Sequence, residues 1–176
     1  KIYQINHPNI IRTFGIFFSD EKNPPSIIFE YCPKNIEQEV NENNLSNVEI
    51  AEILYQIAEG MKYIHKQKLI HLNLKPSKIL IGKDGLIRIS DFFASEIMSL
   101  EISSSSPFEK NDGKFIAPEI LNDEKYDEKA DVYSFGVLMF FILSGGKFPD
   151  ISISQITSGI KAKIPTEFTE FSKSLI

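Results

Sequence analysis

The 176-residue sequence predicts a mixed α+β fold, and three patterns support this prediction. Two short apolar runs near the start are separated by a polar, proline-containing stretch, as expected of two strands and their connecting loop. A later segment repeats apolar residues at every third or fourth position, which is the period of a helix with one buried face. A further segment is apolar nearly all round and indicates a helix in the centre of a domain.

The first two predicted strands correspond to the apolar runs at residues 10–18 and 26–31. The loop between them spans residues 20–25 and contains the pair Pro24 and Pro25, which cannot take part in regular strand pairing. We therefore expect a strand, a polar loop and a second strand at the start of the chain.

The first predicted helix starts at a capping box. Ser46 and Glu49 have the S-x-x-E spacing in which each side chain binds a free backbone N–H at the start of a helix. Apolar residues then recur through positions 50–64, so one face must pack against the rest of the domain. We expect this helix to end near Lys66.

Three further strands are predicted by the short apolar runs at residues 69–70, 79–81 and 86–89. Asp84 and Gly85 suit a tight turn between the last two of these strands.

The second half of the chain predicts one long loop and one buried helix. Residues 94–114 are polar and rich in serine, and a loop of that length in a compact domain is usually functional or disordered. Residues 130–143 are apolar nearly all round, as in a central helix, and the Ser-Gly-Gly sequence at 144–146 should end it.

Composition and charge exclude several classes of protein. The net charge of −5 and the pI near 5.3, without any basic face, argue against a nucleic-acid partner. The longest apolar run, residues 137–143, is too short to cross a bilayer, and residues 1–9 lack the apolar stretch of a signal peptide. Cys32 is the only cysteine, so no internal disulfide can form. We therefore expect a cytoplasmic protein with neither membrane nor nucleic acid as its partner.

Several motifs then occur in a fixed order. Residues 71–80 read H-L-N-L-K-P-S-K-I-L, and this run resembles the catalytic loop H-R-D-L-K-P-x-N-x-L of protein kinases. Residues 91–93 read D-F-F where the family has D-F-G, and residues 117–119 match its A-P-E. Residues 131–136 look like the start of the central F helix of that family. Six such matches in register, including two nearer the start, make coincidence improbable.

The two upstream matches place the boundary between the lobes of the kinase fold. Residues 7–10 resemble the link between the C helix and strand four, and residues 27–32 resemble strand five and the hinge. The resemblance implies a kinase-like fold that is mainly the helical C-lobe. Residues 1–32 would be a remnant of the N-lobe sheet, and residues 33–176 a truncated C-lobe.

The catalytic-loop resemblance assigns roles to two residues. Asn73 stands at the position of the general base, and a carboxamide cannot act as a base near neutral pH. The alternative is that Asn73 still orients a hydroxyl and supports slow turnover. Lys75 is the loop lysine that is typical of the serine/threonine kinases.

The metal positions are altered as well. Lys78 replaces the second metal ligand, and its ammonium offers donors only. It either places a positive charge near Asp91 or extends into solvent, and we expect the second because lysine side chains readily reach water. Asp91 is either a Mg²⁺ ligand or a structural hydrogen-bond acceptor. Phe93 replaces the glycine of the family, which restricts the backbone there.

Departures in the activation segment suggest a locked structure. Leu72 replaces the arginine that pairs with a phosphorylated loop, so the serines at 103–106 are expected to form a tether and not a switch. The Gly-Thr pair of the family falls at Asn111 and Asp112. We hypothesise that Asp112 pairs with Lys75 and that Asn73 joins this network.

The adenine end of the site looks better preserved. By resemblance, Phe29 is the gatekeeper, the backbones of Glu30 and Cys32 meet the adenine edge, and Leu80 forms the floor. Core packing explains Phe29 and Leu80 equally well. ATP is therefore a candidate cofactor, whereas Mg²⁺ is doubtful.

The resemblance also implies segments that the sequence does not contain. A glycine-rich loop, its lysine and a C-helix glutamate belong before His7, and an arginine partner for Glu119 belongs after Ile176. We therefore expect either a piece of a longer protein or a truncated gene model. The leading function is a pseudokinase that acts as a scaffold or allosteric partner of other proteins in signalling. The alternatives are an active serine/threonine kinase with an unconventional site, and a non-functional remnant.

Overall fold

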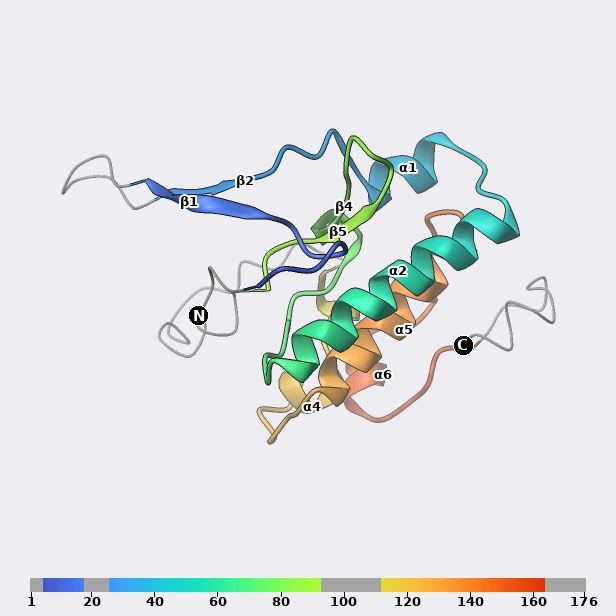
Figure 1. The fold of residues 1–176 in the computed structure, drawn as a ribbon. Helices are drawn as coiled ribbons and strands as arrows, with labels where there is room; N and C mark the ends of the chain where they lie inside the picture. The colour runs from blue at the N-terminus through green and yellow to red at the C-terminus, as the bar shows by residue number, and fades with distance from the viewer. Residues whose placement is uncertain (1–4, 18–25, 93–111, 164–176) are drawn as a thin grey trace.

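The computed structural model describes residues 5–17, 26–92 and 112–163 (Figure 1). The chain starts with the antiparallel strands β1 (Thr13–Phe17) and β2 (Ser26–Phe29). In Figure 1 this hairpin extends away from the helical body. Both strands fall inside the predicted apolar runs, and the predicted loop at 20–25 lies outside the described residues.

A second, three-stranded antiparallel sheet has the order β3–β4–β5 and consists of β3 (Lys34–Asn35), β4 (Ile79–Ile81) and β5 (Ile87–Ile89). The turn between β4 and β5 contains Gly85 at a φ of 78°, which a glycine adopts without steric strain. The prediction of a tight turn between these strands is confirmed.

The helix α2 (Asn47–Lys66) is the longest element of the described chain and begins at the predicted capping box. The Ser46 hydroxyl accepts from the Glu49 N–H, and the Glu49 carboxylate accepts from the Ser46 N–H at 2.8 Å. Its apolar face is buried, and the buried residues are Ile50, Leu54, Ile57, Gly60, Met61 and Ile64. The predicted end at Lys66 is confirmed.

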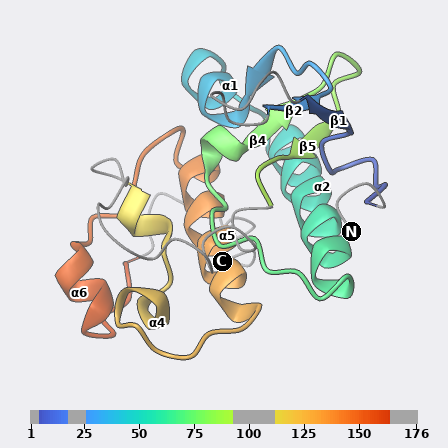
Figure 2. The ribbon, with the colours of Figure 1, turned by 90° about the vertical axis from the view of Figure 1, so that its left-hand side faces the viewer.

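The central helix α5 (Lys129–Leu143) lies beside α2, as Figures 1 and 2 both show. Its buried side chains, among them Leu138 and Phe141, join those of α2 and β5 in one core. The helix ends at Ser144 as predicted, because Gly145 and Gly146 both have positive φ.

Three short helices were not predicted: α1 (Ile36–Glu42), α4 (Pro118–Leu121) and α6 (Ile153–Thr157). The first and last of these begin at capping boxes, formed by Asn35 with Gln38 and by Ser152 with Gln155.

The predicted strand at residues 69–70 is wrong. Leu69 donates its N–H to the Ile64 carbonyl at the end of α2, so this segment closes the helix and does not join a sheet. The predicted long loop is also too long, because the 3₁₀ turn η3 (Asp112–Phe115) begins before its predicted end at residue 114.

The observed mixture of helices and two small sheets confirms the predicted α+β class. No helix within residues 5–17, 26–92 and 112–163 is long and apolar enough to span a membrane.

Candidate functional site

The loop at residues 71–78 is held by one buried carboxylate at the start of α5. Asp131 is 1% exposed and accepts the N–H groups of His71 and Leu72, each at 2.8 Å. The imidazole Nε2 of His65 lies 2.8 Å from the same carboxylate. A buried charge is tolerated only when its oxygens are paired, and both oxygens of Asp131 have partners.

The imidazole of His71 links this loop to the strand that precedes Asp91. Its Nδ1 accepts the N–H of Asn73 at 3.2 Å, and its Nε2 donates to the Ser90 carbonyl at 2.9 Å. This pattern requires the neutral imidazole with the proton on Nε2. Burial lowers the pKa of His71, although the nearby charge of Asp131 opposes that shift.

Leu72 occupies a strained position in the loop. Its φ is 61°, in the left-handed region that a side chain with a Cβ adopts at a cost of about 1–2 kcal/mol. The backbone N–H of Leu72, and not its side chain, makes the contact with Asp131. The loop shape therefore comes from the buried acceptor on α5.

Lys78 does not extend into solvent, which corrects our expectation. Its ammonium forms an ion pair with the Asp91 carboxylate, and the two side chains are 27% and 42% exposed. The two residues are brought close because the N–H and the hydroxyl of Ser90, which precedes Asp91, both donate to the Lys78 carbonyl, at 2.9 and 3.1 Å. The backbones of Lys78 and of the residue before Asp91 are thus bonded to each other.

This pair does not suit a divalent metal. A Mg²⁺ site needs oxygen ligands at short distance, and the ammonium of Lys78 supplies only donors. One oxygen of Asp91 already accepts from Lys78. The positive charge of the lysine would also repel the ion. The residues at this position therefore do not fit the metal.

The predicted adenine residues lie on β2, β4 and the segment after β2. Phe29 is the last residue of β2 and is half-buried. Leu80 lies on β4 and is paired with Arg88 on the neighbouring strand β5. The Glu30 N–H donates to the Arg12 carbonyl at 2.9 Å, so its carbonyl is the backbone group that a ligand could meet. Cys32 is half-buried.

A charged network supports this edge and was missed by sequence reasoning. The Arg88 guanidinium donates to the carboxylate of Glu30 at 3.1 Å and to that of Asp84 at 2.7 Å. Burial, followed by the charge of Glu30, raises the pKa of the Cys32 thiol, while Arg88 opposes the shift. These causes favour the neutral thiol over the thiolate.

A charge inside an apolar run is the signal that could have found the missed residues. Arg88 stands between Ile87 and Ile89 in a buried strand, and Asp131 lies in the first turn of a mostly apolar helix. Charged side chains are almost never fully buried unless they are paired, so both positions imply a partner.

The structure brings Asn73, Lys78 and Asp91 into one connected region through His71 and Ser90. Several predictions lie outside the described residues: those on Phe93, the serines at 103–106 and Asn111. The side chain of Asp112 is likewise outside them, so its pairing with Lys75 stays a prediction.

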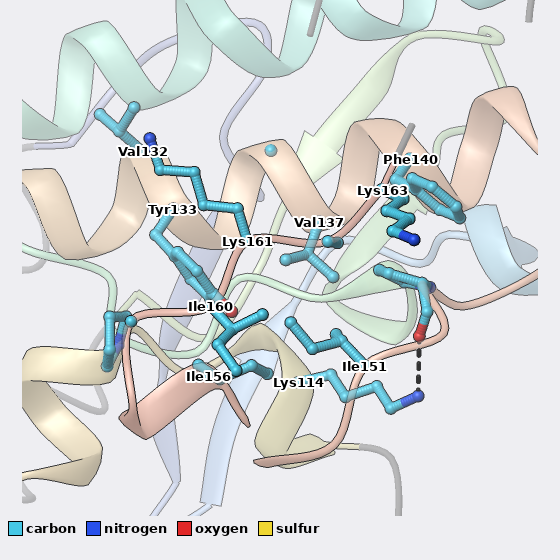
Figure 3. A pocket seen from close by; sticks show the side chains of 15 residues that line it. Lys114, Val132, Tyr133, Val137, Phe140, Ile151, Ile156, Ile160, Lys161 and Lys163 are labelled. Atoms are coloured by element: carbon cyan, nitrogen blue, oxygen red, sulfur yellow. Dashed lines mark hydrogen bonds between the residues drawn. The ribbon is translucent and has the colours of Figure 1, made fainter. Parts of the chain in front are cut away.

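A separate apolar pocket of about 380 Å³ lies between α5, α6 and residues 159–163 (Figure 3). Val137, Ile151 and Ile156 are among its walls, and none of the candidate site residues lines it. At its rim, Lys114 donates to the Pro149 carbonyl at 2.9 Å, which Figure 3 marks with a dashed line. This pocket is therefore distinct from the site on the 71–91 segment.

A histidine-led loop held by an aspartate on a central helix, beside a small sheet, defines a kinase-like domain. Comparisons with known proteins agree. A family model described as protein tyrosine and serine/threonine kinase matches residues 1–170. The chain therefore belongs to the protein tyrosine and serine/threonine kinase family, whose members generally use ATP and Mg²⁺.

Individual relatives come from both substrate classes. The chain is 32% identical to serine/threonine-protein kinase 12 of Arabidopsis thaliana over 82% of this chain and 32% of the relative. It is 28% identical to Aurora kinase of Saccharomyces cerevisiae over 98% of this chain and 47% of the relative. It is 32% identical to the tyrosine-protein kinase transforming protein Abl of Abelson murine leukemia virus, over 87% and 21% respectively. The chain thus spans less than half of each of these relatives.

Proposed function

We propose that this domain is a pseudokinase that acts by binding other proteins in signalling, as a scaffold or an allosteric partner. The observation that carries the proposal is the amide of Asn73, at the position that the resemblance assigns to the general base, in a loop whose N–H groups at residues 71–73 all have acceptors. The chemical group is changed while its support is intact.

The energetic consequence of this change is large. General-base catalysis contributes about 10²–10⁴-fold to a rate. At about 1.36 kcal/mol per tenfold change, this equals roughly 3–5 kcal/mol of barrier. A carboxamide has no proton-accepting capacity near neutral pH, so Asn73 cannot recover this contribution.

The hydrogen bonds around Asn73 also indicate that the loop keeps its shape although the residue at this position is changed. His71 binds the Asn73 N–H, and Asp131 binds the two residues before Asn73. A loop held in this way presents whatever side chain stands at position 73. We infer that Asn73 would present an amide to a substrate hydroxyl.

The adenine end supports a nucleotide-binding role beside the protein-binding one. Phe29, the backbones of Glu30 and Cys32, and Leu80 are proposed to contact adenine. Arg88 supports this edge from β5, because its guanidinium binds the Glu30 carboxylate at 3.1 Å.

The second candidate function is an active serine/threonine protein kinase with an unconventional site. Lys75 favours it by resemblance, and the supported loop around His71 is compatible with it. Under this alternative, Asn73 orients the hydroxyl and turnover is slow.

A phosphotransfer assay on the intact parent protein tests the proposal, with radiolabelled ATP, Mg²⁺ and a general protein substrate. We expect no incorporation by the natural protein or by Asn73→Asp alone. The double variant Asn73→Asp/Lys78→Asn, which returns both family residues, should gain activity. Incorporation by the natural protein that disappears in Asp91→Asn would refute the pseudokinase proposal and favour the active kinase.

A further inference from the structure

We propose that Lys78 is a built-in cation that lets this site bind nucleoside polyphosphates free of divalent metal. The ammonium would bridge the Asp91 carboxylate and the phosphate oxygens. This inference rests on the proposed nucleotide end of the site, and it does not depend on whether catalysis is lost.

The donor inventory of Lys78 permits such a bridge. An ammonium carries three N–H donors, and the ion pair with Asp91 engages part of that capacity. The Lys78 side chain is 27% exposed, so the remaining donors can be reached from solvent. Lysine binds phosphate as a compact point charge, which suits this task.

Hydrogen bonds to neighbouring segments hold the main chain of Lys78 in place. Its carbonyl accepts from both the N–H and the hydroxyl of Ser90, and its N–H donates to the Lys75 carbonyl at 2.9 Å. Ser90 is tied in turn to His71 through its own carbonyl. The main chain that carries this ammonium is therefore held by the same network that shapes the loop, and the ammonium itself is placed by its ion pair with Asp91.

The charge balance also separates this site from a metal site. A divalent ion would have to compete with the ammonium for the Asp91 carboxylate and would be repelled by it. A phosphate group is attracted by the ammonium and repelled by the Asp91 carboxylate, and the ion pair offsets that repulsion without any metal. Divalent metal should therefore add little to nucleotide affinity here.

Fluorescence titration of the full-length protein with mant-ATP tests this inference, once in EDTA and once in excess Mg²⁺. We expect saturable binding in EDTA. Mg²⁺ should lower the Kd by less than about threefold, which corresponds to less than about 0.7 kcal/mol of coupling between metal binding and nucleotide binding. In Lys78→Asn, which supplies a carbonyl ligand and no charge, binding in EDTA should weaken at least about tenfold and Mg²⁺ should restore it.

Two control variants separate this role from general effects. Lys62→Asn removes a lysine whose side chain is 74% exposed and paired with Glu59 on α2, and it should bind like the natural protein. Lys78→Arg keeps the charge and should retain binding in EDTA. Melting temperatures recorded alongside confirm that each variant is folded.

Three results would overturn the inference. They are the absence of mant-ATP binding in EDTA, a large gain of affinity with Mg²⁺ in the natural protein, and unchanged binding by folded Lys78→Asn. None of them bears on phosphotransfer, so they are distinguishable from failure of the pseudokinase proposal.

Discussion

Replacing Asp131 by asparagine should destabilise the domain more than any exposed charge removal. The carboxylate is 1% exposed and accepts the N–H groups of His71 and Leu72 at 2.8 Å each. An asparagine of the same shape must turn its NH₂ toward at least one of these donors. One buried N–H then has no acceptor, and the remaining bond loses its charge.

The magnitude follows from these two losses. An unsatisfied buried donor costs about 1–3 kcal/mol, and a hydrogen bond to a charged group contributes about 1.5–3 kcal/mol against about 1 for a neutral one. We therefore expect Asp131→Asn to lower the free energy of unfolding by about 2–5 kcal/mol. Urea denaturation of the full-length protein, followed by circular dichroism, measures it.

Asp127→Asn is the matched control, since this exposed carboxylate accepts one N–H, that of Lys129, at 2.8 Å near the start of α5. It should change stability by less than about 1 kcal/mol, because its groups are open to water. If Asp131→Asn also costs less than about 1 kcal/mol, the claim that this carboxylate holds the loop is refuted.

Three further predictions concern particular residues. Burial lowers the pKa of His71 below its ordinary value of 6.5, so the unfolded chain binds more protons than the folded one as pH falls. The stability that the neutral imidazole contributes is therefore present above pH 6.5 and is lost as pH falls through the lowered pKa. Melting temperatures across this range should fall with pH, and a folded His71→Gln should fall less steeply. Gly60→Ala should destabilise by about 1–3 kcal/mol despite better helix propensity, because its Cβ would lie 2.7 Å from the Ile89 side chain and 2.9 Å from the carbonyl oxygen of Asn9; equal or higher stability in urea would contradict this. Ser46→Ala should cost about 1 kcal/mol through loss of the cap of α2, and an unchanged urea midpoint would count against it.

The long elements could be predicted because their signals are local. The capping box at Ser46 and the apolar period after it lie within one continuous stretch, and the structure reproduces that helix to its last residue. Residues 69–70 were misread because a two-residue apolar run has no period. Its backbone bond to Ile64 depends on the end of the preceding helix, which no short-range pattern encodes.

The site was predictable in residue identity but not in contacts. The motif at 71–80 marked Asn73 and Lys78 from the order of letters alone. The ion pair of Lys78 with Asp91 joins residues thirteen positions apart, and their backbones meet only because Ser90 binds the Lys78 carbonyl. The role of Asp131 likewise requires two segments about sixty residues apart to meet, as its bond to the N–H of His71 shows.

Because Asp131 binds backbone groups of the loop, the amino-acid sequence of such a loop can change during evolution while its shape is kept. Its two bonds to the loop reach main-chain N–H groups, which every residue except proline possesses. Side chains at positions 72 and 73 can therefore be exchanged without dismantling the loop around them. A lineage could therefore change the residues at these positions one at a time while the domain went on folding.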